Sequence, residues 1–184
     1  MSKRFFAALA VVALAGLSVQ AAAEEGMDGR LKAEKYAAEI IEMRSSLART
    51  FIKPGMEITE ETFKKVCGAV GKRVQEMTAE GVVVRHAAVK FRNPKNEATA
   101  EETELIGEFD RDRDFKEMWD TATVEGKSYL RYTRPIFVED ACLACHGPAE
   151  TRPAWIAEKY PTDRAYDFNS GDIRGIVSVM APEE

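Results

Sequence analysis

The sequence predicts an α+β fold, in which an antiparallel sheet is flanked by helices and preceded by an N-terminal helix. The first observation is the order of the segments along the chain: those with helical periodicity come first, and strand-like segments follow them. The second is that only short helices separate these strands, whereas parallel strands need long crossover helices. The third is the segment 173–182, "IRGIVSVMAP", which predicts a closing strand.

Two helices are expected in the first half of the chain. The first covers residues 28–53 and ends at Pro54-Gly55, and the second begins after Thr59, a helix-capping residue type, and ends at Gly81. In the second helix the apolar residues form one stripe that includes Cys67, so its thiol is expected to face the interior. The stripe residues are Leu31, Tyr36, Ile40, Met43, Leu47 and Phe51 in the first helix, and Phe63, Cys67, Val70, Val74 and Met77 in the second.

The rest of the chain alternates between strands and short helices. Residues 81–94, "GVVVRHAAVKFRNP", predict a strand, and residues 126–140, "GKSYLRYTRPIFVED", predict the clearest one. Short helices are expected over 100–109 and 115–121, and a short helix with a loop over 153–172. The cysteine-containing segment after residue 140 is therefore expected to be a loop directly after a strand.

The N-terminus has the pattern of a secretory signal peptide over residues 1–23. Lys3 and Arg4 precede a short apolar run, and Ala21-Ala22-Ala23 offers a cleavage site. The run is too short and too interrupted to span a bilayer, although an uncleaved anchor is the alternative. We expect residues 24–184 to form one domain without an integral membrane segment, located in the periplasm. The net charge of −5 argues against a nucleic-acid partner.

Two of the three cysteines and one of the two histidines stand together in "CLACH", residues 142–146. This is the C-x-x-C-H spacing at which a c-type haem is attached. The thiols of Cys142 and Cys145 would form thioether bonds with the two porphyrin vinyl groups, and His146 would bind the iron axially. Such attachment takes place outside the cytoplasm, so the motif agrees with the expected export signal.

Other uses of these cysteines remain open on residue type alone. Cys67, Cys142, Cys145 and His86 make a Cys3His set suited to zinc, although zinc sites usually take their thiols from paired short motifs. A thioredoxin-like redox site usually opens a helix inside a βαβ unit, and no such unit is predicted here. A structural disulfide would leave one of the three cysteines over.

The second axial ligand decides what a haem in this chain would do. The residue types leave Cys67, His86, one of the seven methionines or no ligand open. A His/Met pair raises the reduction potential and suits a carrier, whereas a thiolate lowers it. An open position would permit gas binding or chemistry. His86 lies in a predicted strand, where a lone histidine is more often packed or hydrogen-bonded than a ligand.

Three stretches of the chain resemble, in order, the PAS-like c-type haem domain family of small exported cytochromes and sensor domains. They are "FKKVCGAVGKRVQEMTAEGVVVRHAAVKFRNPKNEAT", "YLRYTRPIFVEDACLACHG" and "YPTDRAYDFNSGDIRGIVSV", within residues 31–180. The resemblance implies a PAS-like fold with haem held between sheet and helices. It also implies an axial pair of His146 and, by position, Cys67. His86 departs from the pattern, because relatives tend to have a small or polar residue there.

Together these observations predict a mono-haem c-type cytochrome that works in electron transfer or redox sensing with a separate partner protein. Arg92, Arg134 and Arg174 are candidate contacts for the haem propionates, since a buried carboxylate needs a cation or hydrogen bonds. The alternative functions are a sensor for a small gas ligand and a zinc-binding structural domain. An enzyme such as a peroxidase is not expected, because it needs an open iron face and a placed acid–base group.

Overall fold

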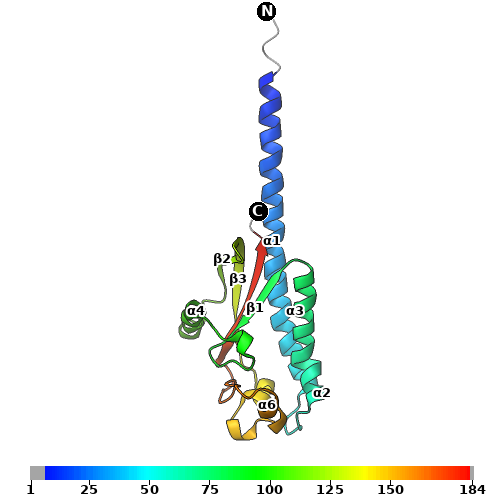
Figure 1. Cartoon of the computed structure of the whole chain (residues 1–184), viewed down its shortest axis with the longest axis vertical. Helices are drawn as coiled ribbons and strands as arrows, with labels where there is room; N and C mark the ends of the chain where they lie inside the picture. Colours follow the sequence, from blue (N-terminus) through cyan, green and yellow to red (C-terminus); the bar gives the residue numbers. More distant parts are fainter. Residues whose placement is uncertain (1–6, 183–184) are drawn as a thin grey trace, which may run out of the picture.

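In the computed structural model, the backbone is described for residues 7–182 and the side chains for residues 29–180. Helix α1 runs from Ala7 to Phe51, and its first part projects away from the rest of the molecule (Figure 1). Residues 1–6 of the expected signal peptide lie outside the described residues and 7–23 are described as backbone only, so cleavage stays a prediction. None of the helices among the described residues combines the length and the apolar character that crossing a membrane demands.

The predicted α+β architecture is confirmed, and its arrangement is PAS-like. Four strands form one antiparallel sheet in the order β1-β4-β3-β2, so the C-terminal strand lies inside the sheet. The strands are β1 (Val83–Ala87), β2 (Met118–Val124), β3 (Lys127–Phe137) and β4 (Ile173–Pro182). Gly175 is required in β4, because a Cβ there, at φ +148°, would lie 2.3 Å from the Ala87 carbonyl oxygen.

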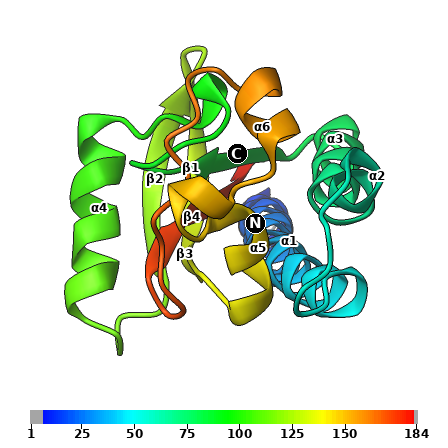
Figure 2. The same cartoon turned by 90° about the horizontal axis from the view of Figure 1, so that it is seen from below.

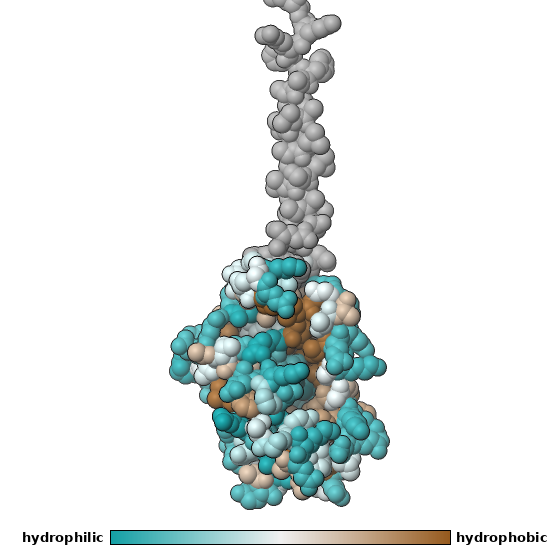
Figure 3. Space-filling view, in the orientation of Figure 1, coloured by the Kyte–Doolittle hydropathy of each residue, from teal (hydrophilic) through white to brown (hydrophobic). Residues whose placement is uncertain are grey.

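Helices cover both faces of the sheet, as Figure 2 shows. Helices α1 and α3 (Ala69–Ala79) cover one face, where Ile40 and Met77 pack against Val177 and Val179. Helix α4 (Ala100–Arg111) covers the other face through Phe109. The face in view in Figure 3 is mostly hydrophilic, in keeping with the acidic composition.

The second predicted helix is present but not uniform. Thr59 caps it as expected, since its hydroxyl accepts a hydrogen bond from the Thr62 amide. The segment begins as α2 (Glu60–Phe63), passes through a π-helical turn, η1 (Lys64–Gly68), and continues as α3. The extra residue of a π turn shifts the side chains that follow it. Cys67 lies in this turn.

One local prediction is wrong. The helix expected over 115–121 is absent, because residues 118–124 form β2, which pairs with β3 across a tight turn at Glu125 (φ 50°) and Gly126 (φ 77°). The alternation in "WDTATV" fits this strand once its partner is known. In α1, the expected apolar stripe faces the core at its centre, where Tyr36 and Ile40 are buried and Met43 and Leu47 pack against the core. Its two end residues are exposed, Leu31 by 58% and Phe51 by 38%.

Short turns close the end of the molecule opposite the projecting part of α1 (Figure 1). After β3 come η3 (Asp140–Cys142), α5 (Leu143–His146), η4 (Ala149–Thr151) and α6 (Ala154–Lys159). A further short turn, η2 (Pro94–Asn96), follows β1, and Asn93 caps it. The cysteine segment, expected as a loop, is therefore two consecutive helical turns directly after a strand.

Candidate functional site

The C-x-x-C-H segment is held by hydrogen bonds from the chain that precedes β4. The Phe168 amide donates to the His146 carbonyl at 3.0 Å, and the Asp167 amide donates to Gly147 at 2.8 Å. Arg92 donates through Nη2 to the Cys145 carbonyl at 2.7 Å, and its own charge is paired with Asp163 at 3.2 Å. The turn is therefore fixed by residues far away in the sequence.

The same segment sets the orientation of the His146 ring. Its Nδ1 lies 2.7 Å from the Ala165 carbonyl oxygen, which can only accept, and 3.4 Å from Arg92 Nη2, which can only donate. We assign the proton to Nδ1 because the contact with Ala165 is the shorter one. The Nε2 lone pair is then free for a metal. Burial, followed by the charges of Arg174 and Arg92, holds the pKa of His146 well below its ordinary value. The ring is therefore neutral, which is the form that binds iron.

One cavity of about 360 Å³ brings together Cys67, His86 and His146, with Arg92 and Arg174 also in its wall. This volume is within the range of small-molecule and cofactor sites. Gly68 and Gly71 line the helix side of the cavity, and a Cβ added at Gly71 would meet no atom within 4 Å. The wall beside Cys67 therefore carries no side chain at these two positions, which leaves room for a flat group.

Cys67 enters this cavity from the π turn. Its side chain is exposed and not packed in the core as the stripe predicted, because the turn directs it at the cavity surface. Val70 and Met77 on the same stripe are buried as expected. π turns are often found at functional sites, because they re-aim one side chain within a regular helix.

His86 lines the cavity too, but its ring is already engaged. Arg44 lies with Nη2 3.1 Å from His86 Nε2, and since a guanidinium has no acceptor, the imidazole nitrogen accepts. Burial, followed by the charges of Arg44 and Arg174, lowers the pKa of His86 to about 3. His86 is therefore a neutral ring whose Nε2 lone pair is held by a cation.

Neither Cys142 nor Cys145 is among the described residues that line this cavity. Cys142 lines a neighbouring cavity of about 310 Å³, which also contains Arg134 and shares Arg44 with the first. Cys145 is buried against Ile58 and Ile156. Burial raises the pKa of Cys142 and raises that of Cys145 to about 11, so neither has the low pKa of a thioredoxin-like thiol.

The alternative zinc site is not assembled. Within the part of the chain that the structure describes, no three His, Cys, Asp or Glu side chains gather as a metal site. The three cysteines are also free of disulfide bonds. The zinc and disulfide alternatives are therefore not supported by this arrangement.

Three arginines around the two cavities lack carboxylate partners among the described residues. Arg44, Arg134 and Arg174 each have a buried Nε with no hydrogen-bond partner there. Burial lowers the pKa of Arg174 to about 10. Buried cations are stable only beside anions or acceptors, so these side chains fit a group that carries carboxylates. A haem c, with two propionates, satisfies this requirement, whereas Arg92 is already paired with Asp163.

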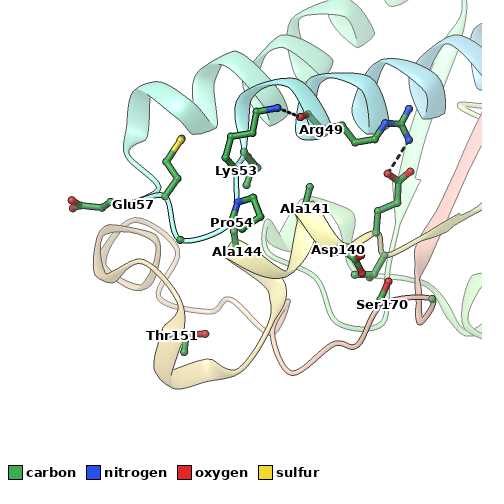
Figure 4. Close-up of a pocket in the computed structure, with 15 residues that line it drawn as sticks. Arg49, Lys53, Pro54, Glu57, Asp140, Ala141, Ala144, Thr151 and Ser170 are labelled. Atoms are coloured by element: carbon green, nitrogen blue, oxygen red, sulfur yellow. Dashed lines mark hydrogen bonds and ion pairs between the residues drawn. The ribbon is translucent and has the colours of Figure 1, made fainter.

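A larger cavity, of about 1120 Å³, lies beside the cysteine turn (Figure 4). The described residues that line it include no cysteine or histidine. Its basic residues Arg49 and Lys53 are engaged, because Arg49 pairs with Glu139 at 3.1 Å and Lys53 donates to the Arg49 carbonyl at 2.7 Å. The described lining therefore offers neither a cysteine or histidine ligand nor an unengaged basic side chain.

Sequence reasoning missed Arg44, Asp163 and the Ala165 carbonyl. Arg44 could have been noticed in the sequence. It lies four residues after Ile40 and four before Ala48, which are both buried, so a charged residue interrupts an apolar stripe of the helix. Asp163 and Ala165 left no such signal, because their partners Arg92 and His146 are distant in the sequence.

Comparison with known proteins identifies the family of this chain. The sequence model of the Tll0287-like family matches residues 20–182. A solved structure, described as the crystal structure of the cyanobacterial heme-protein Tll0287, is similar at 40% identity with a TM-score of 0.70, and the match covers 82% of this chain and 92% of that one. No curated protein matches. The family resemblance seen in the sequence is confirmed, and the chain belongs to the Tll0287-like family.

Proposed function

We propose that the chain is an exported mono-haem c-type cytochrome that acts as a redox protein, in electron transfer or redox sensing. The haem is attached through Cys142 and Cys145, and its iron is bound by His146 and Cys67. The proposal is supported by the relationship to a protein described as a heme-protein. Residues 1–23 serve as its signal peptide, the periplasm is its compartment, and a redox partner protein exchanges electrons with it.

The observation that carries the proposal is the single cavity that contains Cys67 and His146. His146 presents a neutral ring whose Nδ1 is fixed by Ala165, so that Nε2 is directed to the metal. Cys67 reaches the same cavity from a separate element, the π turn. One ligand is thus locked by its hydrogen bonds and the other is carried by an irregular helical turn.

A bound haem c supplies one-electron redox chemistry, and the protein sets its potential. His146 is held in one tautomer, and Cys67 provides a thiolate, which lowers the potential. Arg44, Arg134 and Arg174 offer the positive charge that balances propionates and thiolate. His146 and Cys67 would together hold the iron and leave no position for a substrate, so we propose no enzymatic activity.

A sensor for a small gas ligand is the second candidate, favoured by the exposed Cys67 on its π turn, which is the ligand that could yield. Carbon monoxide added to the reduced protein separates the two functions. A spectrum that does not change supports the redox protein, and a rapid shift of the Soret band supports the sensor.

The ligand pair is tested on full-length protein secreted with cytochrome maturation machinery. Electron paramagnetic resonance of the ferric form should show low-spin iron with a thiolate, and Cys67→Ser should remove that signature and raise the potential. Met77→Leu, a buried change on the same helix, is the control for packing. A Cys67→Ser protein with an unchanged spectrum and potential would contradict the assignment.

A further inference from the structure

Arg44 contacts the second imidazole of the cavity, that of His86. The guanidinium donates from Nη2 across 3.1 Å to His86 Nε2, which leaves the ring proton on Nδ1. The lone pair engaged in this hydrogen bond is the one that His86 would need to bind a metal. Arg44 therefore occupies the metal-binding lone pair of His86, a residue that lines the same cavity as His146 and Cys67.

The same guanidinium lines the cavity that contains the Cys67 thiol. Its buried Nε has no hydrogen-bond partner among the described residues, while its Nη2 is engaged with His86. Without Arg44, the Nε2 lone pair of His86 would be free to bind a metal in the cavity that also holds Cys67 and His146.

We propose that Arg44 is the positioning residue that selects the sixth iron ligand, by engaging His86 Nε2 and so leaving the position to Cys67. The inference rests on the proposed function, because it presupposes a haem bound by His146. Arg174 also faces His86 with its charge, but its hydrogen bond goes elsewhere, since it donates through Nη1 to the Lys90 carbonyl at 2.9 Å and lies over the Phe168 ring. Loss of Arg44 therefore frees the His86 Nε2 lone pair.

The test uses full-length, haem-loaded protein in the ferric form. Arg44→Met keeps most of the apolar stem and removes the charge and the donors. Arg113→Met is the matched control, because Arg113 borders the neighbouring cavity but pairs with Asp110 at 2.6 Å and donates to Gly171. Paramagnetic resonance distinguishes thiolate–imidazole from bis-imidazole iron, and the reduction potential provides a second readout.

We expect Arg44→Met to lose the thiolate signature from most of the ferric protein and to show bis-imidazole iron at a higher potential. The double variant Arg44→Met/His86→Phe should show no bis-imidazole signal, which identifies His86 as the incoming ligand. Arg113→Met should keep the wild-type signature.

An Arg44→Met protein with the wild-type ligand pair, or a double variant that still shows bis-imidazole iron, would overturn the proposal. If Arg44→Met does not load haem, Arg44→Lys serves instead, because it keeps a cation but loses the planar fork. We then expect a mixture of thiolate–imidazole and bis-imidazole signals. A thiolate–imidazole signal alone would contradict the proposal that Arg44 selects the ligand. If the wild-type protein itself shows no thiolate signal, the proposed ligand pair of His146 and Cys67 is wrong. That result is obtained without any Arg44 variant, so it is distinguishable from a failure of the inference on Arg44.

Discussion

Two groups of arginines in this molecule differ in what they face. Arg73, Arg85 and Arg131 pair with carboxylates, as in the 2.6 Å contact from Arg85 to Glu102. Arg44 and Arg134, with Arg174, surround the two cavities and have no such partners among the described residues. The first group stabilises the scaffold, whereas the second is complementary to an anionic group. Unpaired buried charge is thus a better indicator of the site than cavity size, since a larger cavity lies elsewhere.

The largest effect is expected from breaking a buried pair. Asp163 is 1% exposed at its side chain and accepts from both Arg92 and Arg152. Asp163→Asn leaves these cations without their counter-charge and should lower the free energy of unfolding by about 3–5 kcal/mol. Urea unfolding measures it. A loss below about 1 kcal/mol would mean that this pair does not hold the cysteine turn.

The unpaired group should respond with opposite signs in the two forms of the protein. In haem-free protein, Arg134→Met should leave stability unchanged or raise it by about 1–2 kcal/mol, because a buried Nε without a hydrogen-bond partner among the described residues is removed. In haem-loaded protein the same change should cost about 1–3 kcal/mol through a lost charge-assisted hydrogen bond. Thermal unfolding of both forms measures the difference, and equal effects in the two would remove the distinction between the groups.

Acid sensitivity should depend on His86. Its pKa is lowered to about 3 by burial and then by Arg44 and Arg174, so the folded protein does not take up the proton that the unfolded chain binds below its ordinary pKa. Stability is therefore lost as pH falls from about 6.5 toward 3, by up to about 1.4 kcal/mol per pH unit. His86→Phe should flatten the pH dependence of the urea midpoint in this window. Parallel curves for the two proteins would refute the assignment.

The smallest effect is expected for an exposed pair. Arg113 and Asp110 lie 2.6 Å apart with about half of each side chain exposed. Asp110→Asn should change the free energy of unfolding by less than about 0.5 kcal/mol, since solvent screens the pair. A change comparable to that of Asp163→Asn would show that burial does not separate the two classes of pair.

The sequence predicted those parts of the fold that have local signals. The Thr59 cap, the helix over 100–109 and the strand over 126–140 each rest on a few neighbouring residues, and all three are present. Residues 115–121 were misassigned because their strand depends on pairing with β3. The composition of "FKEMWDT" alone does not decide between helix and strand.

The sequence was enough to propose the ligands of the candidate site, but not to find the residues that support them. Cys142, Cys145 and His146 form a motif, so they could be found in one sequence, whereas Arg44 meets His86 only after the chain has folded, 42 positions away. The π turn that directs Cys67 has no signature in the residue pattern, because it differs from an α-helix by a single residue.

The central claim is that Cys142 and Cys145 carry one haem covalently. The most direct measurement is the intact mass of denatured full-length protein, secreted with cytochrome maturation machinery, together with its pyridine haemochrome spectrum. We predict a mass increased by one haem, a c-type haemochrome, and the loss of both in Cys142→Ser/Cys145→Ser. A colourless protein, or haem that is extracted by acid and leaves the mass of the bare chain, would contradict the claim.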